Sequence, residues 1–281
     1  MITLVHLVVS LGMLVIVPLG LGLVPVTFGA TVRRWWPVVA VPGVVSLWLD
    51  RGALSITLAS IYLAGTLGLV GLAAREGLGV VRRGRLRARD IALLTALVTP
   101  SIAALSLVAE RASYELFGFK LTVLSLTVAH FHFAGFAAAL VACLVAASAP
   151  GRAATAAAVS VPLGTGIVLL GFFAGDLVEL IGAAVLTAGM WLVGWVLWQQ
   201  MRLRTADRVT RALLSTSAGV LVATMVLALT WALGQVAGTP HLPLGWMVAT
   251  HGVANALGFA LCSLLAFRRL SLLSPQGAIC R

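Results

Sequence analysis

Apolar runs of about twenty residues recur along almost the whole of this 281-residue chain, and they constrain its fold more than any other feature. Such a run is what an α-helix needs to cross the hydrocarbon core of a bilayer. The second run is short and contains Pro37 and Pro42, so the helix count is eight or nine. We expect helices near 2–26, 35–49, 53–74, 91–109, 119–148, 155–174, 176–198, 212–235 and 244–267.

The chain offers no polar linker long enough to separate two domains. We therefore predict an all-α, polytopic transmembrane helix bundle that forms a single integral membrane domain over residues 1–281. Charged residues make up only 10% of the chain and the mean hydropathy is +1.10. Soluble domains carry about 25% charged residues, so a cytosolic globular enzyme is excluded.

The basic residues gather in alternate loops, although the formal net charge of +11 alone would suggest a nucleic-acid partner. Segments 33–34, 75–90, 149–154, 199–211 and the C-terminus hold sixteen of the nineteen, and the exceptions are Arg51, Arg111 and Lys120. The positive-inside rule places these segments in the cytoplasm, with the N-terminus outside and the C-terminus cytoplasmic. We expect a multi-pass plasma-membrane protein whose loops meet anionic lipid, and no nucleic-acid partner.

Acidic and histidine side chains gather toward the opposite, outer half. Asp50, Glu110, Glu115, Asp176 and Glu179 all fall at expected outer helix ends or in short outer loops. At 1.5 Å per residue, His251 lies roughly 12 Å deep, and His130 and His132 roughly 16 to 20 Å deep. Ionisable groups at such depths are costly and usually face a partner or a wet cavity, so a polar pocket that opens on the outer half is predicted.

Two histidine segments resemble each other. The fifth expected helix reads AHFHFAGF over 129–136, and the ninth reads THGVANALGF over 250–259. In both, a histidine is followed by Gly-Phe-Ala, which could reflect a distant duplication. His130 and His132 point about 200° apart, so they cannot bind one metal as an i,i+4 pair could. We favour His132 for the pocket because it shares a face with Gly135 and Phe136; a plain packing role for one of the two histidines is an equal alternative.

A pair of carboxylates follows Gly175 at the start of the seventh expected helix. Asp176 and Glu179 are three residues apart, so they share one helix face. Two close carboxylates in a poorly hydrated site cannot both ionise cheaply, so one would keep a proton near neutral pH and could act as a general acid. Stabilisation of the helix N-terminus is an equally good interpretation.

The two histidine segments resemble the YndJ-like family of bacterial polytopic membrane proteins, and outside these two helices only the hydropathy agrees. Members of that family are often labelled transporters. In size, and in having carboxylates embedded in the membrane, the chain also looks similar to the small membrane-bound terpene cyclases, although no cyclase motif matches residue by residue.

We predict an integral membrane enzyme that cyclises a lipophilic isoprenoid or meroterpenoid by acid initiation. A carboxyl among Glu110, Asp176 and Glu179 would give the proton, and His132 and His251 would assist it. The expected substrate contacts are His130, Asn255, Trp191, Phe136 and Phe259, whose aromatic faces would stabilise carbocations. No cofactor or metal is expected. The alternatives are a proton-coupled secondary transporter and a histidine-ligated haem or metal protein.

Overall fold

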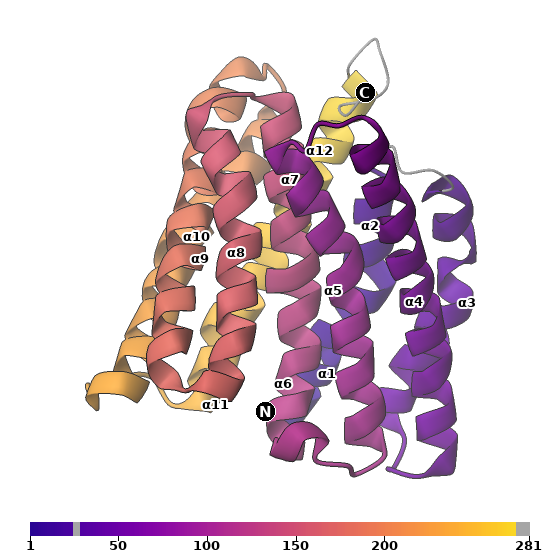
Figure 1. The fold of residues 1–281 in the computed structure, drawn as a ribbon. Helices are drawn as coiled ribbons and strands as arrows, with labels where there is room; N and C mark the ends of the chain where they lie inside the picture. The colour runs from indigo at the N-terminus through magenta and orange to yellow at the C-terminus, as the bar shows by residue number, and fades with distance from the viewer. Residues whose placement is uncertain (25–28, 274–281) are drawn as a thin grey trace. The chain divides into compact units, whose positions relative to one another are not determined.

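The computed structural model describes residues 1–24 and 29–273 (Figure 1), and all regular secondary structure in these ranges is helical. Within these ranges, eight helices are long and apolar enough to cross a membrane, which confirms the all-α, multi-pass prediction. They span Ile2–Leu21, Ala53–Arg82, Ala88–Arg111, Leu121–Ser148, Arg152–Ala174, Asp176–Arg204, Arg208–Ala237 and Leu244–Leu272. The expected short second helix is α3, Gly29–Trp48. Residues 25–26 of the first expected helix and the tail from residue 274 lie outside the described residues, and the orientation of the termini stays a prediction.

The chain divides into two compact units. Unit 1 comprises residues 1–86 and 93–137, with α1 (Ile2–Leu11), α2 (Val17–Leu21), α3, α4 (Ala53–Arg82), most of α5 (Ala88–Arg111) and α6 (Leu121–His130). Unit 2 comprises residues 87–92 and 138–281, with α7 (Ala138–Ser148), α8 (Arg152–Ala174), α9 (Asp176–Val196), α10 (Arg208–Ala237), α11 (Leu244–Met247) and α12 (Cys262–Leu273). The single membrane domain stays a prediction.

Several helices are longer than their apolar runs. Helix α3 begins at Gly29 and so includes Arg33 and Arg34, and α4 continues beyond Arg75 to Arg82. Hydropathy marks only the stretch that suits the hydrocarbon core. A helix keeps its backbone hydrogen bonds beyond that stretch, and long arginine side chains reach outward to water.

Glycines set the close packing of α8 on α9 in unit 2. A Cβ added at Gly164 would overlap the backbone nitrogen of Leu186, and one at Gly171 would lie 2.6 Å from the backbone of Glu179. Small residues allow helix backbones to approach in this way. Gly175, with φ of 109°, is the one residue that joins the two helices, and it places Asp176 and Glu179 at the start of α9.

Segments of π-helix interrupt the helices that carry the two histidine motifs. One covers Phe131–Ala137 after α6, and two more, Val248–Gly252 and Ala254–Leu261, precede α12. In unit 2, Asn255 bonds Thr224 of α10 and Ser263 bonds Ser217 of α10. In an α-helix, two residues eight positions apart point about 80° away from each other around the helix axis. The wider π-turns reduce this angle and bring Asn255 and Ser263 onto one face.

Candidate functional site

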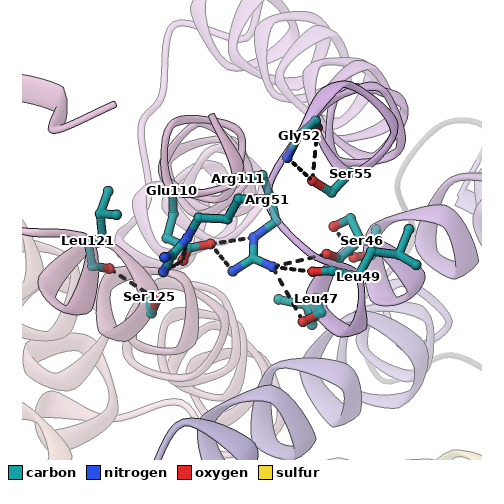
Figure 2. A network of polar contacts seen from close by, with 11 residues as sticks. Ser46, Leu47, Leu49, Arg51, Gly52, Ser55, Glu110, Arg111, Leu121 and Ser125 are labelled. Atoms are coloured by element: carbon teal, nitrogen blue, oxygen red, sulfur yellow. Dashed lines mark hydrogen bonds and ion pairs between the residues drawn. The ribbon is translucent and has the colours of Figure 1, made fainter. Parts of the chain in front are cut away.

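The last turn of α5 holds a buried cluster of charges in unit 1 (Figure 2). Glu110 is 1% exposed and Arg111 is 4% exposed, and both interact with residues near the end of α3. Arg51, in the turn between α3 and α4, is the third member, and its side chain is 45% exposed. Buried ionisable groups in a membrane protein are costly, so such a cluster is a functional-site hypothesis by default.

Both oxygens of the Glu110 carboxylate accept hydrogen bonds from arginine. Arg51 donates from Nε and Nη2 to Oε1 at 3.1 and 2.7 Å. Arg111 donates from Nε to Oε2 and forms an ion pair with the same oxygen. Glu110 therefore holds the guanidinium groups of Arg51 and Arg111 together through charge-assisted hydrogen bonds.

Arg111 also caps the C-terminal end of α3. Its Nη1 donates to the carbonyl oxygens of Ser46, Leu47 and Leu49 at 3.2, 3.4 and 3.2 Å. The last carbonyls of a helix have no partner within the helix, and a basic side chain that reaches them stabilises the helix terminus. The guanidinium of Arg111 therefore fastens the end of α5 to the end of α3.

A small cavity, lined mostly by apolar side chains, adjoins this cluster. It leaves about 10 Å³ for the centre of a water molecule, and its polar lining is His6 of α1, Glu110, and Ser125 of α6. The His6 Nε2 atom is buried with no hydrogen-bond partner among the described residues. The space is near the minimum that one water needs, and a water there would have polar groups to bind.

Sequence reasoning singled out Glu110 but missed its partners, although a signal was available. Arg51 and Arg111 are two of the three basic residues that fall outside the predicted cytoplasmic segments. A basic residue outside the cytoplasmic segments usually has a local partner, and here both arginines pair with the carboxylate of Glu110.

His132 lies in the π-helical segment of unit 1 and is fully buried. Its Nδ1 is 2.7 Å from the carbonyl oxygen of Val128, and its Nε2 is 2.6 Å from the hydroxyl of Tyr62 in α4. A carbonyl can only accept, so Nδ1 carries the proton, and Nε2 of the neutral ring accepts from Tyr62. Val128 also lines the cavity beside Glu110, which places His132 next to that cavity's wall.

His251 and Asn255 form a matching polar cluster in unit 2. His251 Nδ1 is 2.8 Å from the carbonyl oxygen of Thr224 in α10, and Asn255 Oδ1 accepts from the Thr224 hydroxyl at 3.0 Å. The Asn255 amide donates to the His251 carbonyl oxygen at 3.0 Å. Each histidine motif thus offers one ring nitrogen to a backbone carbonyl, from within or beside a π-helical segment.

The expected aromatic contacts divide into buried and exposed side chains. Phe136 and Phe259 are 0% and 2% exposed, respectively, so they belong to the packed interior. His130 is partly buried and packs edge-on against Phe131, with 5.6 Å between ring centroids. Trp191 is 41% exposed on α9.

The carboxylate pair lies at the start of α9 in unit 2. Asp176 is exposed and Glu179 is partly buried, and neither forms an ion pair among the described residues. Phe173 and Leu177 beside them are 58% and 62% exposed. The carboxylates therefore lie among apolar side chains that a lipophilic molecule can reach.

The candidate residues are thus divided between the units. Glu110, His130, His132 and Phe136 belong to unit 1, and Asp176, Glu179, Trp191, His251, Asn255 and Phe259 to unit 2. Within unit 2, His251 and Asn255 are in contact, whereas Trp191 is separated from Glu179 by twelve residues, about 18 Å along α9.

His132 is poorly suited to bind a metal or haem iron. Both of its ring nitrogens are engaged. Ligation needs a free lone pair on a ring nitrogen. Among the described residues, no group of three or more His, Cys, Asp or Glu side chains is placed to hold a metal ion.

The comparison with family models gives a match to the YndJ-like proteins over residues 7–259. This range contains both histidine motifs, the charge cluster of Glu110 and the carboxylate pair. No curated protein and no solved structure matches the chain. The match spans most of the sequence, and we conclude that the chain belongs to the YndJ-like protein family.

Proposed function

We propose that this YndJ-like protein is an integral membrane enzyme that protonates a lipophilic isoprenoid or meroterpenoid and so initiates its cyclisation in the bacterial plasma membrane. The carboxylate pair Asp176 and Glu179 carries the proposal. Glu179 is partly buried, has a second carboxylate three residues away, and has exposed apolar neighbours on the same helix. These are conditions in which one carboxyl group keeps a proton and an apolar substrate can approach it from the bilayer.

The other candidate residues have different contacts, and we assign each a role from these contacts. Glu110 accepts hydrogen bonds from Arg51 and Arg111, which suits it to organise the charge cluster rather than to act as the acid. His132 and His251 hold fixed hydrogen bonds and so serve as positioning residues. The face of Trp191 is open to a ligand and is suited to stabilise a carbocation.

The test compares three single variants in isolated membranes that are incubated with linear, prenylated and epoxidised terpenoids. Glu179→Gln and Asp176→Asn remove the acid while they keep the side-chain volume, and we expect at least one of them to abolish cyclised product. Glu115→Gln, in an exposed loop of unit 1, is the matched control and should retain full turnover. Unchanged product in both acid variants would refute the assignment.

A proton-coupled secondary transporter is the second candidate, favoured by the similar construction of the two units. Each unit presents a histidine that bonds a backbone carbonyl, a π-helical segment, and a Gly-Phe pair whose phenylalanine is buried. Internal repeats and interrupted helices are typical of secondary transporters, and intramembrane acid and histidine groups are typical of proton relays.

Proteoliposomes that contain a pH-sensitive dye test the transporter. Addition of a transported solute should change the internal pH, and His132→Phe and His251→Phe should slow that change. Solute flux that is indifferent to the pH gradient would count against proton coupling.

A further inference from the structure

Helix α9 and its continuation present one exposed apolar stripe along their length in unit 2. Its large side chains are 62%, 50%, 41%, 56% and 39% exposed, in the order Leu177, Ile181, Trp191, Trp195 and Trp198. Exposed positions at 184 and 188, both alanine, continue the stripe between Ile181 and Trp191. Spacings of three and four residues keep all these positions on one helix face.

A positively charged group lies at the end of this stripe. The guanidinium carbon of Arg202 is 3.9 Å from the ring centroid of Trp198, a cation–π contact that holds the charge beside the indole. The Arg202 Nε is buried and has no hydrogen-bond partner among the described residues. No carboxylate in the described ranges is ion-paired with Arg202.

The segment that follows Arg202 is strongly positive, because Asp207, the acid closest to it in the sequence, is already paired with Arg269. Asp207 accepts hydrogen bonds from the Thr210 hydroxyl and backbone N–H at 2.5 and 2.8 Å, and it pairs with Arg269 at 3.1 Å. Hydrogen bonds from Thr210 and then from Arg269 lower the pKa of the Asp207 carboxyl to about 2, so it stays ionised and paired. Arg204, Arg208 and Arg211 in the same segment then add charge that no carboxylate of the described residues offsets by an ion pair.

We propose that this face binds an anionic phospholipid of the bilayer, with the phosphate beside Arg202 and Trp198 and an acyl chain along the stripe toward Ala188. Tryptophan and arginine meet where the hydrocarbon core gives way to headgroups, so Arg202 and Trp198 match the headgroup and the stripe from Trp195 toward Ala188 matches an acyl chain. Charge complementarity selects an anionic headgroup over a zwitterionic one. The headgroup end of this site lies away from the proposed acid pair at the other end of α9, whereas its acyl-chain part includes Trp191, which the proposed function assigns to the substrate.

The experiment measures lipids retained by the full-length protein when it is released from nanodiscs of equal phosphatidylglycerol and phosphatidylcholine. We expect the wild type to retain phosphatidylglycerol preferentially. Arg202→Gln should reduce that preference about fivefold, the factor that corresponds to ~1 kcal/mol for one arginine near an anionic surface. Trp198→Leu should reduce it as well, through loss of the ring that orients Arg202.

Arg85→Gln is the matched control, because Arg85 is an exposed arginine of unit 1 between the described helices α4 and α5. It should leave the preference unchanged, whereas an equal loss in Arg85→Gln and Arg202→Gln would show only general surface charge and would overturn the site. Arg202→Lys keeps the charge and should retain most of the preference if the fold is intact.

Two added ligands separate the sources of the phosphate. Inorganic phosphate at millimolar concentration should not displace the retained lipid; if it does so fully, the site recognises phosphate alone and the proposal fails. If a prenyl phosphate displaces phosphatidylglycerol completely at equimolar concentration, the occupant is a substrate-like lipid and the proposal fails too. Retention is measured without turnover, so a failure here is distinct from a failure of the enzyme proposal.

Discussion

The buried arginine of the charge cluster gives the most decisive test of the fold of unit 1. Replacement of Arg111 by methionine removes a guanidinium whose side chain is only 5% exposed. The change leaves Glu110 buried without one of its two cations and leaves three carbonyls at the end of α3 without their donor. Loss of one partner from a buried ion pair costs about 3–5 kcal/mol, so we expect Arg111→Met to destabilise the protein by that amount.

Arg51 provides an internal control, because it pairs with the same carboxylate from a side chain that is 45% exposed. Exposed ion pairs contribute only about 0–1 kcal/mol, so Arg51→Met should cost no more than this. Unfolding by sodium dodecyl sulfate in mixed micelles, followed by fluorescence of the eight tryptophans, measures the difference.

A double variant separates the buried charge from the lost packing. Glu110→Leu combined with Arg111→Met removes both charges, and apolar replacement of a buried pair is often close to neutral. We therefore expect the double variant to be more stable than Arg111→Met alone. If Arg111→Met and Arg51→Met were equally mild, the cluster would not be the buried and desolvated network that we describe, and the reasoning would be wrong.

Three further perturbations test other parts of the structure. Gly164→Ala should destabilise the protein by roughly 1–3 kcal/mol because its Cβ would overlap the backbone of α9, whereas Gly166→Ala, with open space around it, should be tolerated in the same unfolding assay. Tyr62→Phe should cost about 1–3 kcal/mol because it leaves the buried Nε2 of His132 without its donor, and an unchanged unfolding midpoint would contradict that hydrogen bond. The lowered pKa of Asp207 contributes stability that is present above about pH 4 and is lost as the pH falls toward 2; Asp207→Asn should weaken the pH dependence of unfolding in that window.

The helices were predictable from the sequence because hydropathy is a local property. Every transmembrane helix of the structure overlaps an expected run, and α9 begins at Asp176 as expected. The ends were less predictable. Helix α4 continues to Arg82 because neither charge nor hydropathy stops a helix that has already reached the interface.

The partners in the candidate site could not be predicted in the same way, because they depend on packing between distant segments. Tyr62 lies seventy residues from His132, and Arg51 lies fifty-nine residues from Glu110. The sequence indicated that buried polar groups need partners, but not which residues would supply them. The π-helical segments likewise reflect tertiary contacts rather than local propensity.

The π-helical segment Ala254–Leu261 has a consequence for how this chain can change in evolution. It brings Asn255 and Ser263 to the same neighbour, α10, although eight residues separate them. Loss of a single codon within the segment would remove the extra residue that the wide turns hold and restore ordinary α-helix, in which seven residues turn about 700°. Ser263 would then still lie within about 20° of the face that carries Asn255. This stretch should therefore accept the deletion of one residue more readily than the regular helix α10, in which the same deletion would rotate everything beyond it by about 100°.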